Sequence, residues 1–319
     1  MSEIDQNKHT NDLNDQIDLR ELFSVLIKGK WIIVGVTIFF LVIGIVYSLL
    51  LPDIYKSEAL LATVDEPSMT GGVLNQYSGL AGLAGINLPT GDSGNNSKKA
   101  IELMSSLNFF ENYMLPKIFL PDLIAVESWD EEKNKIIYDE NIFKKDSNTW
   151  VNNSTDTDNL IPSAQASFEV FKGHFNIKKD ESGYVVLSMK HQSPFISKQW
   201  VEIFVEEINA FYRQKDKSQS EKAVIYLNKQ IANTSLSEIR EVTASILEKE
   251  IQKLTLIEAN KDYVFEYIYP PSVMERKSEP QRTLIVNLFI LFGCMIGIIM
   301  VLFRHYLSKE KITTKRISA

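Results

Sequence analysis

Two long apolar runs, one near each end of the chain, constrain the fold more than any other feature of this sequence. Trp31–Leu51 has 21 residues and Leu284–Phe303 has 20, and neither run contains a charged residue. At about 1.5 Å per helical residue, each run covers about 30 Å, the thickness of the hydrocarbon core of a bilayer. A soluble helix of this length would show a polar face, and neither run does. Both runs are therefore predicted to be transmembrane helices.

The first run is predicted to stay in the protein as an anchor. It is longer than the apolar core of a signal peptide, which has about 7–15 residues, and no small-x-small cleavage site follows it. Next to the two runs, eight basic residues lie on the outer sides and only four, Lys56, Arg276, Lys277 and Arg282, lie on the inner sides. This asymmetry places both termini, residues 1–30 and 304–319, in the cytoplasm. The outer residues are Arg20, Lys28 and Lys30 before the first run, and Arg304, Lys309, Lys311, Lys315 and Arg316 after the second.

Residues 52–283 are then predicted to be exported. They carry 25 basic and 34 acidic residues, a net charge of −9, which argues against binding to nucleic acid or to an anionic membrane surface. The only cysteine, Cys294, lies in the second apolar run. Because no disulfide is possible in the exported part, packing and assembly must stabilise it.

The exported part reads as strands at both of its ends with helices between them. We expect strands in 53–67, in 175–192 with a tight turn at Gly183, and in 262–271. Helices are expected from Ser97 to Pro116 and from Pro162 to Phe171, and a Gly- and Ser-rich loop in 68–96. The predicted class is α+β, with a membrane-proximal mixed α/β base, a long protruding helix and two flanking transmembrane helices.

The long helix is predicted over about residues 194–262. Phe195–Tyr269 contains neither glycine nor proline. Sixty to seventy helical residues would extend about 90–105 Å, so the helix must project from the base. Its apolar stripe would then bury against other copies or a second helix, and a charge such as Ile208→Asp should break the oligomer. The stripe is Ile196, Trp200, Phe204, Ile208 and Phe211. The alternative is two helices with a turn between Asn233 and Ser237.

Two smaller motifs border the second apolar run. Pro270, Pro271 and Pro280 precede it and predict a stiff, extended connector, because proline fixes φ. Gly293 and Gly297 form a G-x-x-x-G motif inside it, which lets two helix backbones approach closely in a membrane. Gly35 and Gly44 offer weaker notches in the first run.

The sequence contains no pattern typical of catalysis. Four histidines, His9, His174, His191 and His305, are spread along the chain, and no Cys/His cluster for zinc and no G-x-x-x-x-G-K-[ST] phosphate loop occurs. No catalytic, cofactor-binding or metal-binding residue is predicted, and the chain is predicted not to be an enzyme.

Several stretches together resemble the Wzz-type polysaccharide co-polymerases, the chain-length determinants of bacterial surface polysaccharides. They are "DLRELFSVLIKGKW" and "YKSEALL" around the first run, "VESWD", "IPSAQASFEVFKGHFNIKKDESGYVVLSMKHQSP", "WVEIFVEEINAFYRQKD", and "YPPSVMERKSEPQR" before the second run. The last is the most characteristic, because a proline-rich segment enters the second helix in this family. Met274 stands where a further proline is common.

The resemblance implies a non-enzymatic, ring-shaped homo-oligomer in the bacterial inner membrane, with its central domain in the periplasm. It also implies control of the length of O-antigen or a related glycan, with membrane lipid, a separate Wzy-type polymerase and lipid-linked glycan as partners. The chain ends 16 residues after the second run and has no phosphate loop, so we expect the kinase-free class. The alternatives are an export component working with a separate cytoplasmic tyrosine kinase and a two-span ligand sensor.

Overall fold

The chain divides into two compact units. A computed structural model describes residues 19–64, 93–151 and 161–317. The first unit comprises Met1–Pro52 together with Glu279–Ala319, and the second comprises Asp53–Ser278. The Gly- and Ser-rich loop expected in 68–96 falls almost wholly outside the described residues.

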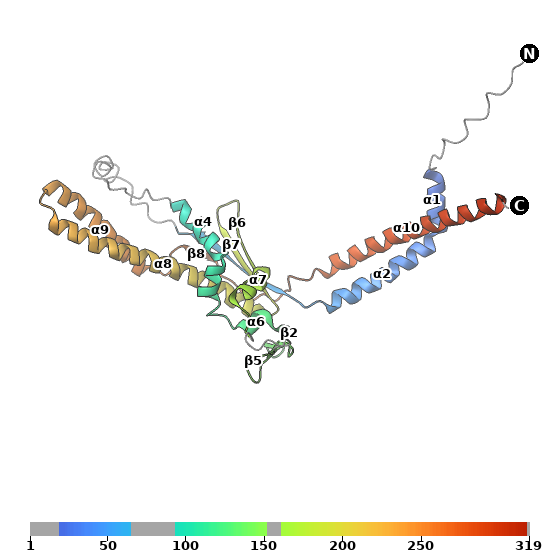
Figure 1. The fold of residues 1–319 in the computed structure, drawn as a ribbon, viewed down its shortest axis with the longest axis horizontal. Helices are drawn as coiled ribbons and strands as arrows, with labels where there is room; N and C mark the ends of the chain where they lie inside the picture. The colour runs from blue at the N-terminus through green and yellow to red at the C-terminus, as the bar shows by residue number, and fades with distance from the viewer. Residues whose placement is uncertain (1–18, 65–92, 152–160, 318–319) are drawn as a thin grey trace, which may run out of the picture. The chain divides into compact units, whose positions relative to one another are not determined.

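In its described residues, the first unit is a bundle of three helices. α1 (Leu19–Lys28) and α2 (Lys30–Leu50) are separated by Gly29, and α10 (Arg282–Ile317) packs along α2 (Figure 1). Lys30–Leu50 and Arg282–Leu307 are long and apolar enough to cross a membrane, judged by length and composition. The two predicted apolar runs lie in these helices, except that Leu51 follows the end of α2.

An antiparallel sheet of four strands, in the order β6-β7-β1-β8, forms the base of the second unit. The strands are β1 (Tyr55–Thr63), β6 (Phe175–Lys179), β7 (Val185–His191) and β8 (Phe265–Tyr269). All three predicted strand regions are confirmed. Gly183 has a φ of +91° in the turn between β6 and β7, which explains the need for glycine there.

One face of this sheet is buried under helices, and its residues alternate as a half-buried sheet requires. Ala59 and Leu61 of β1 and Leu187 and Met189 of β7 are almost completely buried against α8. Shorter helices complete the core with aromatic side chains: α4 (Ser93–Met104), α5 (Leu107–Phe109), the π-helical turn Phe110–Met114, α6 (Leu120–Ile124) and α7 (Ala164–His174).

The helix ends differ in part from the sequence prediction. Ser163 caps α7 as expected, since its hydroxyl accepts from the Ala166 amide at 3.2 Å. Ser97, however, lies inside α4 rather than at its start, and the helix predicted from Ser97 to Pro116 is interrupted. Ser106 begins the new segment there by accepting from the Phe109 amide at 3.2 Å.

The long helix is two helices, so the prediction of one continuous helix over about 194–262 is wrong. α8 (Pro194–Asn233) has 40 residues and spans about 60 Å, and α9 (Ser237–Ala259) folds back along it (Figure 1). The break lies where the alternative placed it. Thr234 has an extended backbone, and its carbonyl accepts from the Arg240 guanidinium at 2.8 Å. Asn, Thr and Ser favour such turns because their side chains compete for backbone hydrogen bonds.

A small lobe of two hairpins lies beside the base. It consists of β2 (Val126–Asp130) with β3 (Lys135–Tyr138), and β4 (Phe143–Lys144) with β5 (Thr149–Trp150). Its own apolar cluster contains Ala125, Ile136, Tyr138 and Phe143. The whole is therefore an α+β fold with a long helix and two helices of membrane-spanning length, as predicted.

Candidate functional site

Gly293 and Gly297 of α10 lie directly against α2. A Cβ atom added at Gly293 would lie 3.0 Å from the Thr37 Cα, and one at Gly297 would lie 2.9 Å from the Ile33 Cα. Only glycine allows the two backbones to approach this closely. Gly44 of α2 makes a similar contact with α10, because a Cβ added at Gly44 would lie 2.8 Å from the Phe289 Cβ. Gly35 meets nothing within 4 Å, so it makes no such notch.

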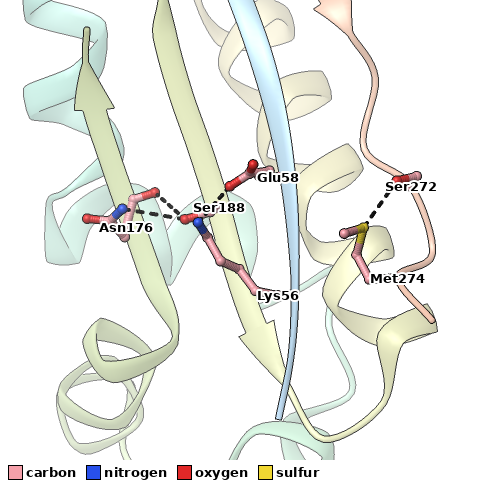
Figure 2. Close-up of polar contacts among 6 residues, drawn as sticks. All are labelled: Lys56, Glu58, Asn176, Ser188, Ser272 and Met274. Carbon is pink, nitrogen blue, oxygen red and sulfur yellow. Dashed lines mark hydrogen bonds and ion pairs between the residues drawn. The ribbon is translucent and has the colours of Figure 1, made fainter. Parts of the chain in front are cut away.

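The connector containing Pro270 and Pro271 is tied to the start of β1. The Ser57 hydroxyl donates to the Ser272 carbonyl at 2.9 Å, the Ser278 amide donates to the Ile54 carbonyl at 2.8 Å, and Lys277 pairs with Asp53 at 3.0 Å. In Figure 2 the Ser272 hydroxyl also contacts the Met274 sulfur, at 3.5 Å. These bonds tie the segment to the residues at the start of β1 without a proline at Met274. Pro280 lies in the other unit, just before α10.

The stripe predicted to join copies of the chain is buried inside one chain instead. Trp200, Phe204 and Ile208 are at most 2% exposed and belong to the main core, and Ile196 and Phe211 pack on that core while partly exposed. For Trp200, Phe204 and Ile208 the predicted interface is therefore wrong, and for Ile196 and Phe211 it stays a prediction. The physical reason is the sheet, whose apolar face β1 and β7 offer to this same stripe.

Farther along the hairpin, other apolar side chains are open to solvent. Inside it, Leu227 of α8 and Ile257 of α9 are buried at 9% and 1% exposure. The hairpin surface is the set Ile225, Tyr226, Leu236, Ile239, Ile251 and Leu256, of which Ile225 is 70% exposed. We did not predict Ile225 and Tyr226, although residues 223–227 are five consecutive apolar residues. Successive residues of a helix are rotated by about 100° around its axis, so five consecutive side chains point to all sides of it. One partner helix can cover only some of them.

A row of polar side chains crosses three strands on the sheet face opposite to the core. Lys56 and Glu58 of β1 form an ion pair at 2.6 Å. Asn176 of β6 and Ser188 of β7 contact each other through two hydrogen bonds of 3.4 Å (Figure 2). Glu58, Ser188 and Asn176 are cross-strand partners. Because these groups already satisfy one another, the row reads as the polar face of a one-sided sheet.

The two described histidines of the second unit lie near each other but are not arranged for catalysis. Nδ1 of the buried His191 accepts from the Ser193 amide at 2.8 Å, and Nε2 lies 2.8 Å from the Asp122 carbonyl, so Nε2 carries the proton. Burial lowers the pKa of His191 to about 4. Neither nitrogen is available to take a proton from a substrate. His174 is held similarly, with Nδ1 2.7 Å from the Lys190 carbonyl.

Asp122 links this histidine to the small lobe. Its side chain accepts from the Tyr138 hydroxyl at 2.5 Å while its carbonyl contacts His191. Burial raises the pKa of Asp122 and also that of Tyr138. Within the described ranges, no group of three or more His, Cys, Asp or Glu side chains could hold a metal ion. The arrangement ties elements together and offers no reactive group.

Comparisons with known proteins identify the first third of the chain. Residues 15–114 match the family model described as Wzz, chain length determinant protein. No curated protein matches the chain.

Among solved structures, the chain is similar to a full-length bacterial polysaccharide co-polymerase, with 13% identity over 92% of this chain and 99% of that chain and a TM-score of 0.39. It is also similar to a fragment of WzzB, a polysaccharide co-polymerase from Salmonella Typhimurium, with 12% identity over 72% and 100% of the two chains and a TM-score of 0.31. A mutant of the Shigella flexneri O-antigen chain-length regulator WzzB gives 12% identity over 71% and 100%, with a TM-score of 0.24.

The fold defines the class of protein. It has two helices long enough to span a membrane and, between them in the sequence, one large α+β domain. Within this class, residues 15–114 match the Wzz chain length determinant family, and the resemblance predicted from the sequence is confirmed over these residues.

Proposed function

We propose that this protein is a non-enzymatic scaffold of the bacterial inner membrane that regulates the chain length of O-antigen or a related surface polysaccharide. A separate Wzy-type polymerase makes the polysaccharide, and the scaffold acts on that polymerase or on its lipid-linked glycan. The observation that carries the proposal is the match of residues 15–114 to the chain length determinant family.

The membrane arrangement of the proposal has both termini in the cytoplasm and residues 52–283 in the periplasm. Two helices of spanning length support it, and so does the larger number of basic residues on the outer flanks of the two apolar runs than on their inner flanks. A cysteine introduced at the exposed Lys172 should react with a membrane-impermeant maleimide once the outer membrane is permeabilised. Protection of this cysteine until the inner membrane is lysed would contradict the arrangement.

The scaffold is proposed to be a homo-oligomer, in a ring, with the hairpin surface as one contact between copies. Large apolar side chains such as Ile225 and Tyr226 are 70% and 61% exposed in a single chain. Exposed apolar patches of this kind often mark protein–protein contacts, because burying them removes apolar area from water. Trp200, Phe204 and Ile208 have no part in this contact, because they are buried inside one chain.

Glycan length profiling tests the function. Deleting the gene should leave polymerisation intact but should replace a modal distribution of glycan lengths by a broad one on a gel. Complementation with the full chain should restore the mode. A ladder of lengths that is unchanged by the deletion would refute the proposed function.

A further inference from the structure

The small lobe carries an open hollow of about 480 Å³, which is within the range of about 300–1,000 Å³ typical of ligand sites. One stretch of chain, from Asp130 to Ser147, supplies all the residues that line it. The buried side chains of Ile136, Tyr138 and Phe143 contribute the apolar part. Because the hollow is open to solvent, a segment of a long polymer can enter it without threading an end.

The walls of the hollow are preformed. The Tyr138 hydroxyl is fixed by its bond to Asp122, and the Lys145 ammonium lies 5.0 Å from the centre of the Tyr138 ring. The turn between β3 and β4 is closed by Asp139, whose carboxylate accepts from the amide and the side chain of Asn141 at 2.8 and 2.9 Å. A preformed site loses less conformational entropy when a ligand binds.

The rim mixes hydrogen-bond donors and acceptors. Four lysines line the hollow, together with three carboxylates and the Ser147 hydroxyl; the charged residues are Lys133, Lys135, Lys144, Lys145, Asp130, Glu140 and Asp146. Lys133 is paired with Asp130 at 3.5 Å. Among the described residues, no ion pair joins Lys135, Lys144, Glu140 or Asp146 to another side chain. Donors and acceptors there are open to a ligand.

This rim fits a neutral, hydroxyl-rich ligand best. Glu140 and Asp146 repel an anion, and the lysines repel a cation, so neither gains a strong net attraction. A sugar hydroxyl both donates and accepts, so neighbouring hydroxyls can bond to an ammonium and to a carboxylate at once. The C–H surface of a sugar ring can meet the apolar floor.

We propose that the hollow between β2–β3 and β4–β5 binds a sugar unit of a polysaccharide chain. That the polysaccharide is the one whose length is regulated rests on the proposed function. The hollow would then be a contact point that holds the growing glycan on the scaffold.

Saturation-transfer NMR on the full chain tests the binding. The chain is held in lauryldimethylamine oxide micelles, because the headgroups of sugar detergents would compete. The probe is polysaccharide released from the host cells by mild acid and cut to a few repeats. The lobe variant, Lys135→Ala with Glu140→Ala and Lys144→Ala, changes exposed side chains and leaves the floor intact.

A matched control makes the same change of charge elsewhere. It is Lys178→Ala with Lys179→Ala and Glu181→Ala, which are exposed residues at the β6–β7 turn. The wild-type chain and the control should transfer saturation to the sugar protons, and the lobe variant should bind at least about tenfold more weakly, with an unchanged circular dichroism spectrum. Equal binding by the lobe variant, or no binding by the wild type, would overturn the proposal. So would displacement of the sugar by an equal concentration of inorganic phosphate, which would indicate an anion site.

The glycan profile separates this proposal from the proposed function. If the deletion broadens the length distribution and the lobe variant restores the mode without binding sugar, the hollow has no part in length control although the function stands. If the deletion leaves the ladder unchanged, the function is refuted whatever the hollow binds. Loss of the mode in the lobe variant, with the control normal, supports both.

Discussion

Asn209 shows how single polar residues hold the second unit together. Its side-chain amide is buried between α8 and β8, where it donates to the Phe265 carbonyl at 2.8 Å and accepts from the Val264 and Phe265 amides at 2.9 Å. These three bonds satisfy backbone groups of Val264 and Phe265, where the edge strand β8 begins beside α8. The neighbouring Ile208 is completely buried in the same place. Both residues act inside one chain.

The effect of changing Ile208 should therefore be on folding rather than on assembly. Ile208→Ala should lower the free energy of unfolding by about 2–5 kcal/mol, because it leaves a cavity in a packed core. Ile225→Ala, at a site 70% exposed, should change it by at most about 0.5 kcal/mol. Chemical denaturation of the full chain followed by circular dichroism measures both. Equal stability of the two variants would contradict the burial of Ile208.

His191 should make stability depend on pH. Its pKa is lowered to about 4 by burial, with a smaller contribution from the nearby His174, whereas the unfolded value is about 6.5. Below about 6.5 the unfolded chain takes up a proton that the folded chain does not, so stability falls between about pH 6.5 and 4, by about 3 kcal/mol. His191→Gln should flatten this fall in thermal unfolding followed over pH. A slope as steep as that of the wild type would show that other groups cause it.

At the scale of elements, the two units differ in how their helices pack. α2 and α10 contact each other through glycine notches, whereas α8 packs on a sheet at one end and on α9 at the other. In the first contact, glycines let the helices approach closely, as expected where lipid offers no hydrophobic drive for helix association. Large apolar residues dominate the second contact, because removing their surface from water is favourable.

Adding a methyl group at the notch should push the helices apart. Gly297→Ala places a Cβ 2.9 Å from the Ile33 Cα, a backbone atom that cannot move aside, and should cost about 1–3 kcal/mol. Gly35→Ala meets nothing within 4 Å and is the matched control. Thermal unfolding in detergent should show a lower midpoint for Gly297→Ala alone. Equal midpoints would mean that α2 and α10 do not pack here.

The hairpin can be distinguished from a single straight helix by one distance. Lys217 of α8 and Glu258 of α9 form an ion pair, whereas a continuous helix would separate them by about 60 Å. Nitroxides on Lys217→Cys and Glu258→Cys, in a Cys294→Ser background, should report a distance below about 20 Å by pulsed electron resonance. Dilution with unlabelled chain excludes contacts between copies. A distance near 60 Å would restore the single helix.

At the scale of the whole molecule, assembly depends on the surface that one chain leaves open. The exposed apolar side chains of the hairpin surface lie outside both apolar clusters. If copies associate through them, a charge there should act on assembly and leave the fold of each copy intact, because an exposed side chain adds little to folding.

A double variant tests this separation. Ile225→Asp with Ile239→Asp should reduce the mass in detergent, measured by light scattering, towards a protomer of 36.4 kDa. Asn228→Asp adds a charge at an exposed position on the same helix and should keep the oligomer. An unchanged mass for the double variant, or a loss of mass for the control, would remove the hairpin surface from the interface.

The sequence by itself determined the two apolar helices, the antiparallel strands, the turn at Gly183 and the family resemblance. All of these depend on local periods, on runs of one residue type or on short motifs, which neighbouring residues specify without knowledge of the fold. Only the tertiary structure decided which partner each apolar face meets. The stripe from Trp200 to Ile208 looks the same whether a sheet or another copy covers it, and the turn at Thr234 leaves no glycine or proline to mark it. The hollow also depends on contacts across the lobe, since its charged rim reads in sequence as an ordinary solvated surface.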